Sequence, residues 1–424
     1  MHQARFCFIL MVTLAVLIAA SQATAATVGT CGPPPRYTTI QAAVYASAPG
    51  ATILVCPGTY PEQVMINKPL TLTGASLTAA SGAVIVSPAG GLSGNATSFS
   101  SGNPIAAQIL VQNTTRVTIN NLTVDGSNNQ VNTCGPPTVV GIFYQNASGT
   151  VTNNAVFNQR LGPGYEGCQN GLGIFVQSGS GGSSNVAIAT NVVQGYQKNG
   201  ITGNEAGTRI TVTSNNVTGQ GATTGAAENG VQIGFGATGS ITLNSTLDDV
   251  WAPDTISDPG DAAAGILVYA SSNVLISGNT VGNTQYGIAV VTDASEGVAD
   301  NNQILQNRVN ATHIFDAIDV CSNRNLIQGN ILSGSDESGV HLDSSCGFTG
   351  NLNRVNANVV NSACAGILLG SGTIGNLLLN NTLYNVSSTI MNGDQCPGMF
   401  AAADVTLNAA STTGSGRQYQ PVRP

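Results

Sequence analysis

Three ionisable residues occupy matching places in two neighbouring segments of the sequence. Asp319 and His341 each stand third in a short apolar segment that begins with a small residue, and Asp343 follows His341 by two places. If these segments stack as adjacent strands, Asp319 lies about 5 Å from His341. A carboxylate at that distance favours the charged imidazole and raises its pKa. The three side chains therefore predict acid and base chemistry.

The spacing of the two aspartates suits hydrolysis of a glycosidic bond. One strand spacing and two residues along a strand place Asp319 and Asp343 about 8 Å apart, within the range of about 6.5–9.5 Å expected of an inverting glycosidase. We predict that these two residues share the acid and base roles and that His341 tunes them. Asp316 and Glu337, in the adjoining turns, are predicted to contact the substrate. The alternative is that all five residues form solvated surface or a hydrogen-bonded polar ladder.

The longest insertion of the sequence, residues 248–264, lies close to this cluster. It carries five aspartates and the only tryptophan, Trp251, and it leads into the segment that contains Tyr269. Trp251 and Tyr269 would offer platforms on which sugar rings stack, and the aspartate oxygens could hold Ca²⁺. Because the spacing matches no EF-hand loop, an acidic solvent loop broken by proline is the alternative.

The elements that must position these residues form a repeat of about 22 to 35 residues. Each unit opens with a Gly or Ala and an apolar segment, continues with a second apolar segment, and places an Asn before a third. The openings stand at Gly141, Gly173, Gly200, Gly230, Gly265, Gly287, Ala317, Gly339 and Gly366. The asparagines are Asn121, Asn154, Asn191, Asn216, Asn244, Asn279, Asn307, Asn330, Asn358 and Asn381.

Three short strands per unit, with no helical period, predict one triangular coil of a solenoid. Asn tolerates the left-handed backbone of a tight corner and can bond to its copies in adjacent coils, so we predict a structural asparagine stack. Alternate side chains of a strand face opposite ways. If the second and fourth places of each opening strand fill the core, the third and fifth places, which include the acidic cluster, face outward onto an exposed sheet.

Composition agrees with an all-β protein. Of the 424 residues only 8% are charged and 42% are apolar, whereas exposed helices need charged residues and disorder needs low hydrophobicity with high net charge. The formal net charge is −8, and the lysines are Lys68 and Lys198. This balance argues against nucleic acid as a partner, since phosphate binding needs clustered cations.

The N-terminus reads as an export signal. Within residues 1–25, the basic residue Arg5 precedes an apolar run, and the segment ends in Ala23-Thr24-Ala25, as in signal peptides. We expect a secreted or periplasmic protein with no membrane span. Removal of Cys7 leaves an even number of cysteines, which favours disulfides. The preferred pairing joins Cys31 to Cys56, Cys134 to Cys168, Cys321 to Cys346 and Cys364 to Cys396.

The first segment of the mature chain reads as a cap. Thr39 precedes a brief amphipathic helix over residues 40–44 as its N-cap, and strands follow. The run "TIQAAV", "GATILVCPGTYPEQVMI" and "LTLTGA" over residues 39–74 resembles the N-terminal cap and first coils of right-handed parallel β-helix proteins of the pectin-lyase-like superfamily. The repeats over residues 105–390 resemble its β-helix region.

The resemblance implies a single-stranded right-handed parallel β-helix with a short N-terminal capping helix. The expected organisation is a signal peptide at 1–25, cap and first coils at 26–75, the β-helix at 76–400 and a flexible tail at 401–424. The sequence contains none of the catalytic signatures of pectin methylesterases, polygalacturonases or alginate epimerases. No catalytic residue of the superfamily is therefore transferred to this chain, and a superfold hosts many functions.

We predict a secreted, monomeric β-helix that binds an extended polysaccharide on an exposed parallel-sheet face; if it is an enzyme, hydrolysis of a glycosidic bond is the favoured reaction. The alternative is a non-catalytic carbohydrate-binding or adhesive protein that uses the same rod. A polyuronate lyase assisted by Ca²⁺ ranks third, because β-elimination needs charge neutralisation. The cations near this face are Arg308, Arg324 and Arg354.

Overall fold

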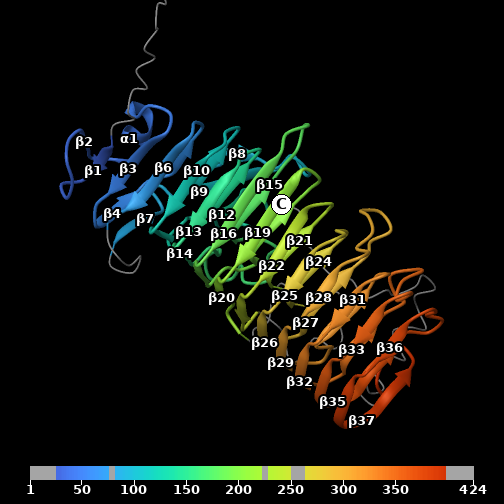
Figure 1. Cartoon of the computed structure of the whole chain (residues 1–424). Helices are drawn as coiled ribbons and strands as arrows, with labels where there is room; N and C mark the ends of the chain where they lie inside the picture. Colours follow the sequence, from blue (N-terminus) through green and yellow to red (C-terminus); the bar gives the residue numbers. More distant parts are fainter. Residues whose placement is uncertain (1–24, 76–81, 222–227, 250–262, 398–424) are drawn as a thin grey trace, which may run out of the picture.

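The computed structural model describes residues 25–75, 82–221, 228–249 and 263–397. The predicted signal peptide, most of the 248–264 insertion and the predicted tail lie outside the described residues. The chain coils into a long rod of stacked strands (Figure 1). Each coil contributes one strand to a 14-stranded sheet and two strands to a 23-stranded sheet.

The 14-stranded sheet runs along one side of the rod (Figure 1). Its members are β1 (Ala26–Val28), β2 (Arg36–Tyr37), β3 (Ala51–Val55), β6 (Leu70–Gly74), β10 (Val117–Asn120), β13 (Gly149–Thr152), β16 (Ser184–Ala189), β19 (Thr208–Thr213), β22 (Thr238–Thr242), β25 (Leu275–Ser277), β28 (Gln303–Leu305), β31 (Leu326–Gln328), β34 (Arg354–Asn356) and β36 (Leu377–Leu379).

The 23-stranded sheet consists of two stacks. The short-strand stack is β4 (Gly58–Pro61), β7 (Ala83–Val86), β11 (Thr123–Asp125), β14 (Ala155–Phe157), β17 (Val192–Gln194), β20 (Asn216–Thr218), β23 (Ser245–Leu247), β26 (Thr280–Thr284), β29 (Arg308–Thr312) and β32 (Ile331–Ser335). The long-strand stack is β5 (Val64–Ile66), β9 (Pro104–Gln112), β12 (Thr138–Gln145), β15 (Leu172–Gln177), β18 (Asn199–Asn204), β21 (Asn229–Gly234), β24 (Ala264–Tyr269), β27 (Tyr286–Val291), β30 (Ile318–Cys321) and β33 (Ser338–Leu342). β35 (Val359–Leu369) and β37 (Thr382–Asn392) continue both stacks.

Among the described strands, every pairing is parallel except that of β8 (Ala96–Thr97) with β9. This arrangement confirms the predicted parallel β-helix. The core is a column of aliphatic side chains that occupy the same place in successive coils, as Ile288, Ile318 and Val340 do in the long-strand stack. Burial of an aliphatic side chain stabilises the folded state by about 25 cal/mol per Å² of apolar surface. The repeated Ile and Val positions therefore stabilise every coil in the same way.

An asparagine ladder runs along one corner of the rod. In each step an Asn side-chain amide donates to the side-chain oxygen of the Asn in the next coil, at 2.9–3.1 Å. The same amide also donates to a backbone carbonyl, as from Asn279 to Ile241 at 2.9 Å. The ladder comprises Asn154, Asn191, Asn215, Asn244, Asn279, Asn307, Asn330, Asn358 and Asn381.

Two of the predicted ladder positions are wrong. Asn216 is an exposed member of β20, and its neighbour Asn215 is the ladder residue. Asn121 has a left-handed backbone with φ of 56°, and Leu122 occupies the ladder place, where its N–H donates to Asn154. The prediction that the ladder asparagines adopt the left-handed corner is also wrong. The residue before each of them does so, as Leu243 does with φ of 58°.

A second, shorter ladder escaped the sequence analysis. It joins the side-chain oxygens of Asn325, Asn353 and Asn376 to the backbone N–H groups of the asparagines one coil earlier, at 2.8 Å each. These residues lie in the turns that precede the last strands of the 14-stranded sheet. Side-chain amides therefore satisfy the backbone at two corners of the C-terminal coils.

The predicted cap forms at the N-terminal end. Helix α1 (Ile40–Ala46) begins after Thr39, whose side chain accepts a hydrogen bond from the N–H of Ala42. The Glu62 carboxylate accepts from the N–H groups of Ile40 and Gln41 at 2.8 and 3.0 Å. These bonds satisfy the first orphan donors of the helix, and they tie it across the end of the core.

Four disulfides cross-link the rod. They join Cys31 to Cys56, Cys134 to Cys168, Cys321 to Cys346 and Cys364 to Cys396, which are the pairs expected from the sequence. Such a disulfide content is typical of exported proteins. In the part of the chain that the structure describes, no helix is both long and apolar enough to cross a membrane.

The ladder predicts a large difference in stability between loss of a ladder asparagine and loss of an exposed one. Asn279→Ala removes a buried amide that donates to Ile241 and Asn307 and accepts from Asn244. Because a buried polar group left unsatisfied costs about 1–3 kcal/mol, we expect the free energy of unfolding to fall by about 2 kcal/mol or more in denaturant titrations. The exposed Asn216→Ala is the matched control, with an expected change of about 0.5 kcal/mol or less. Equal losses in both variants would contradict a structural ladder.

Candidate functional site

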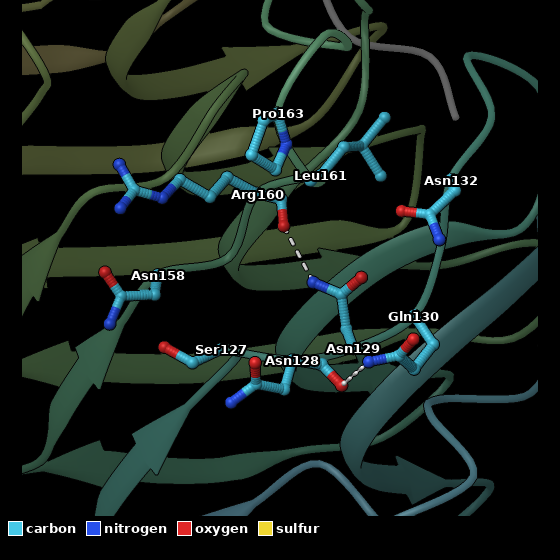
Figure 2. A pocket seen from close by; sticks show the side chains of 10 residues that line it. Ser127, Asn128, Asn129, Gln130, Asn132, Asn158, Arg160, Leu161 and Pro163 are labelled. Carbon is cyan, nitrogen blue, oxygen red and sulfur yellow. Dashed lines mark hydrogen bonds between the residues drawn. The ribbon is translucent and has the colours of Figure 1, made fainter.

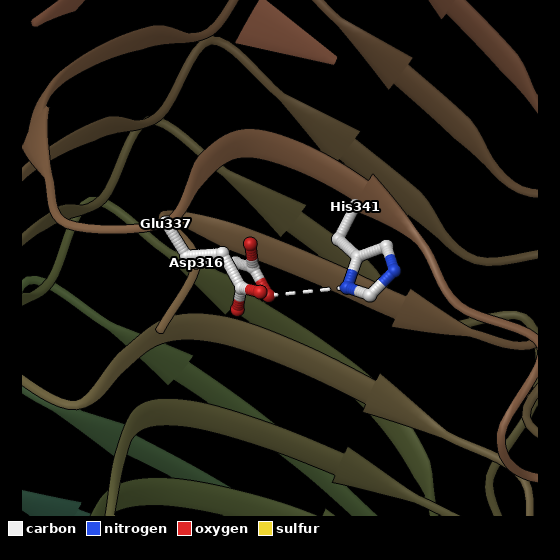
Figure 3. Close-up of side chains that lie close together, drawn as sticks. All are labelled: Asp316, Glu337 and His341. Carbon is white, nitrogen blue, oxygen red and sulfur yellow. Dashed lines mark hydrogen bonds and ion pairs between the residues drawn. The ribbon is translucent and has the colours of Figure 1, made fainter. Parts of the chain in front are cut away.

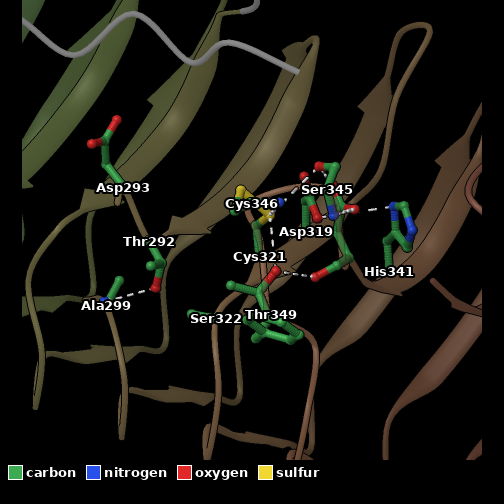
Figure 4. Close-up of a disulfide and its surroundings, with 12 residues drawn as sticks. Thr292, Asp293, Ala299, Asp319, Cys321, Ser322, His341, Ser345, Cys346 and Thr349 are labelled. Carbon is green, nitrogen blue, oxygen red and sulfur yellow. Dashed lines mark hydrogen bonds and ion pairs between the residues drawn. A yellow bond between two sulfur atoms is a disulfide. The ribbon is translucent and has the colours of Figure 1, made fainter. Parts of the chain in front are cut away.

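The predicted acidic cluster assembles on the outer side of the long-strand stack. Register places Asp319 of β30 directly opposite His341 of β33. Asp316 lies two residues before β30, and its carboxylate faces the His341 ring together with Glu337 (Figure 3). The Cys321–Cys346 disulfide lies beside Asp319, which pairs with His341 (Figure 4). The structure therefore brings together the five residues that the sequence singled out.

The contacts within this cluster are mostly charge-assisted hydrogen bonds. His341 Nδ1 lies 3.3 Å from Asp316 Oδ2 and 3.9 Å from Asp319 Oδ1. The other oxygen of Asp316 accepts from the N–H and hydroxyl groups of Ser338 at 3.1 and 2.6 Å. Asp343 accepts in the same way from the N–H and hydroxyl groups of Ser345, both at 2.7 Å.

The expectation that this cluster lies on an exposed face is wrong. Asp316, Asp319, Glu337 and His341 are 0% exposed, and Asp343 is 1% exposed. Their side chains do point away from the core column, as alternation predicted. However, the outer rank of this stack is buried over these coils, where it comprises Thr202, Gln232, Leu267, Ala289, Asp319, His341 and Leu368.

Aromatic side chains from the turns explain part of this burial. Phe315, which precedes β30, stacks on Tyr286 with ring centroids 4.5 Å apart. Phe235, which follows β21, packs on Tyr269 at 5.2 Å. Tyr269 is 6% exposed, and its hydroxyl donates to Asp293. It is therefore not the open sugar platform that we expected, and Trp251 lies outside the described residues.

The negative charges around His341 favour the protonated form of its imidazole ring. Burial alone lowers the pKa of this imidazole, but the carboxylates of Asp316, Asp343 and Asp319 outweigh burial and raise the pKa to about 10. At neutral pH His341 is therefore an imidazolium ion, and its Nδ1–H donates to Asp316.

Two sets of side chains have the geometry to hold a metal ion. They are Asp316, Glu337 and His341, and Asp319, His341 and Asp343, with ligand atoms within 4.8 Å of one another in each set. A histidine must lose its proton before it can bind a metal. His341 is common to both sets, so binding of a metal at either one would have to displace its proton. Most of the insertion aspartates proposed for Ca²⁺ lie outside the described residues.

A second buried acidic group escaped the sequence analysis. The Tyr196 hydroxyl donates to Asp249 at 2.6 Å, and both side chains are 0% exposed. Burial raises the pKa of Asp249 well above its ordinary value. Burial and the nearby charges of Asp249 and Glu228 likewise raise the pKa of Tyr196. In the sequence, this buried group is indicated only by an aspartate next to the end of a strand. The other aspartates of the insertion obscured this signal.

An open polar pocket lies elsewhere, between the loops that follow β11 and β14 (Figure 2). It has a volume of about 340 Å³. Its lining residues are Ser127, Asn128, Asn129, Gln130, Asn132, Asn158, Arg160, Leu161, Gly162 and Pro163. These residues provide five side-chain amides, one hydroxyl and one guanidinium group, and no carboxylate is among them.

The two pocket loops are held by covalent and polar links. The Cys134–Cys168 disulfide joins them, and Leu161 packs with Val131 in a small apolar cluster beneath. Asn129 donates to the backbone oxygen of Arg160 at 2.7 Å (Figure 2). Asn132 and Arg160 keep exposed side chains, and Arg160 also donates to Gln220 at 3.1 Å. The pocket is therefore supported from below and has exposed polar groups at its rim.

Comparison with known proteins agrees with this fold. A family model described as "Right handed beta helix region" matches residues 224–383, less than half of the chain. A search of curated proteins found no match. The solved DFA-IIIase from Arthrobacter chlorophenolicus A6, without its lid, is 15% identical, with 79% of this chain and 88% of that chain covered and a TM-score of 0.53.

Two further solved structures align over most of this chain. The Dettilon tailspike protein is 14% identical over 81% of this chain and 62% of its own, with a TM-score of 0.53. The GH136 lacto-N-biosidase from Eubacterium ramulus is 11% identical over 87% of this chain and 67% of its own, with a TM-score of 0.51. Together with the family match, these likenesses show that the chain has a right-handed parallel β-helix of the pectin-lyase-like fold.

The ion pair in the cluster predicts a pH-dependent stability. The pKa of His341 is about 10 in the folded protein and about 6.5 in an unfolded chain. Because the folded pKa is the higher one, the stabilisation is complete below about pH 6.5 and is lost as pH rises towards about 10, at up to about 1.4 kcal/mol per pH unit. Denaturant titrations across this window should show the loss in the wild type, whereas His341→Gln should lack it. Parallel pH profiles for the two proteins would refute the buried imidazolium.

Proposed function

We propose that this protein binds an extended carbohydrate polymer and that the pocket between the β11 and β14 loops holds one segment of it. The pocket's lining of amides, one hydroxyl and one guanidinium carries the proposal. Amide groups both donate and accept hydrogen bonds, as sugar hydroxyls do. A few fixed polar groups in a pocket of this size are sufficient to orient a small ligand.

The lining also favours binding over turnover. Hydrolysis of a glycosidic bond requires two carboxyl groups that flank the bond, and no residue that lines the pocket is an aspartate or glutamate. The lacto-N-biosidase shares the fold at 11% identity, and a fold shared at that distance supports a carbohydrate ligand only as an analogy. The chemistry of the pocket therefore supports the carbohydrate ligand more directly than the shared fold does.

The enzymatic alternatives require the buried cluster to act. A polymer cannot reach Asp319 and Asp343 where they stand, since these side chains are 0 and 1% exposed. Their roles as acid and base, and elimination assisted by Ca²⁺, stay predictions. If turnover is found, Asp319→Asn and Asp343→Asn should each reduce it by a factor of about 100 or more.

One screen separates these functions. The purified mature protein is incubated with a panel of polysaccharides, and retention, reducing ends and absorbance of unsaturated uronates are recorded together. Retention without new reducing ends supports the proposal. Reducing ends alone indicate a hydrolase, and reducing ends with unsaturated uronates indicate a lyase.

Pocket variants test where the polymer binds. Asn132→Ala and Arg160→Ala each remove an exposed polar group from the rim, and a hydrogen bond contributes about 0.5–1.5 kcal/mol. We therefore expect the double variant to bind the retained polysaccharide about tenfold more weakly in affinity electrophoresis. Asn216→Ala, an exposed amide on β20, is the matched control and should bind as the wild type does. Unchanged affinity in the double variant, with an unchanged melting temperature, would place the ligand elsewhere.

A further inference from the structure

The 14-stranded sheet presents two ranks of short side chains on its outer face, and nine of these twelve side chains bear a hydroxyl group. Parallel register aligns the first rank as Thr71, Thr118, Thr150, Ala187, Thr211 and Ser240, and the second as Thr73, Asn120, Thr152, Ala189, Thr213 and Thr242. Eight of these twelve positions are threonine. We call these twelve residues the threonine face. It covers the six successive strands from β6 to β22, which lie side by side in Figure 1.

The threonine face is open to solvent. All twelve side chains are partly exposed, whereas the residues between them, such as Ile119, Val151 and Val212, are 0% exposed and belong to the core. This contrasts with the outer rank of the long-strand stack, which is buried from Thr202 to Leu368. The 14-stranded sheet therefore provides the exposed parallel-sheet face that we had expected on the other sheet.

Hydrogen bonds between coils align these side chains. The hydroxyl of Thr150 donates to that of Thr118 at 3.0 Å, and the hydroxyl of Thr242 donates to that of Thr213 at 3.1 Å. Asn120 donates to the hydroxyl of Thr73 at 3.0 Å. Each hydroxyl has one donor and two acceptor sites, so groups that bond to a neighbour still have sites directed at solvent.

The spacing of these groups is regular in two directions. Neighbouring strands lie about 4.8 Å apart, and two residues along a strand span about 6.6 Å. The aliphatic column beneath the sheet and the asparagine ladder at its corner fix these repeats. The face therefore has the rigid, two-dimensional order of a lattice.

The chemistry of the threonine face restricts its ligand. None of its twelve residues is charged or aromatic. Arg209, the nearest charge on β19, is exposed outside the two ranks. A neutral face does not select a polyanion, and a face without aromatic rings cannot stack sugar rings. A complementary surface must be uncharged, flat, and periodic in hydrogen-bonding groups.

We propose that the threonine face binds ice. An ice surface is uncharged and presents oxygen atoms in a fixed two-dimensional array that both donates and accepts hydrogen bonds. Threonine hydroxyls supply matching groups at fixed intervals, and threonine methyl groups bury apolar surface against the solid. The proposal does not depend on carbohydrate binding, because the polar pocket lies in loops of the short-strand stack and shares no residue with this face.

Ice recrystallisation and thermal hysteresis measured on the mature protein test this proposal. Thr150→Tyr and Thr211→Tyr each place a ring in the middle of the face and obstruct contact with a flat solid. Both side chains point to solvent, so the fold should be retained. We expect the wild type to arrest recrystallisation, and each variant to require a concentration about tenfold higher or more.

Thr59→Tyr, at an exposed position of β4 in the short-strand stack, is the matched control and should act as the wild type does. Melting temperatures identify any variant that is misfolded. Ice growth unaffected by the wild type, or equal activity of the face variants and the control, would overturn the proposal. Sedimentation with microcrystalline polysaccharide that Thr150→Tyr abolishes, without any effect on ice, would also overturn it and assign the face to a polymer.

Discussion

The parallel register between successive coils is the constraint on which the rest of the structure depends. Each strand bonds to the equivalent strand one coil away, so any feature of one coil is set directly against the same position of the next. The asparagine ladder holds this register at the corner, where backbone groups would otherwise lack partners. Its members are separated by 23 to 37 residues along the chain, yet the bonds keep a length of 2.9–3.1 Å.

The same register has opposite chemical results on the two faces of the rod. On the long-strand stack it brings Asp319 against His341 in a buried layer, where low polarity strengthens their attraction. On the 14-stranded sheet it aligns threonines in open solvent, where they form ordered ranks. The pocket differs from both, because it is formed by two loops that leave the coil and are joined by a disulfide. Stacking thus provides the scaffold and the faces, and departures from stacking provide the cavity.

Much of the fold could be predicted from the sequence because equivalent positions of successive coils carry the same types of residue. A lone asparagine before an apolar segment identifies the corner, as at Asn279, but a pair such as Asn215 and Asn216 leaves two registers open. Alternation predicted that Asp319 points away from the core. It could not predict burial, because Phe235 and Phe315 reach this face from turns whose paths no periodicity describes. The threonine ranks were missed because their alignment depends on loops of unequal length between the strands.

The asparagine ladder also determines how the length of this protein can change. Each rung makes the same bonds to the coil before and the coil after it. Deletion of one complete coil, from one rung to the next, would therefore join two coils whose corners and cores already fit each other. Deletion of half a coil would leave an amide facing an aliphatic side chain and would shift every later strand out of phase. Insertions and deletions in such a rod should therefore add or remove whole coils. The length of the rod should change in steps of one strand spacing.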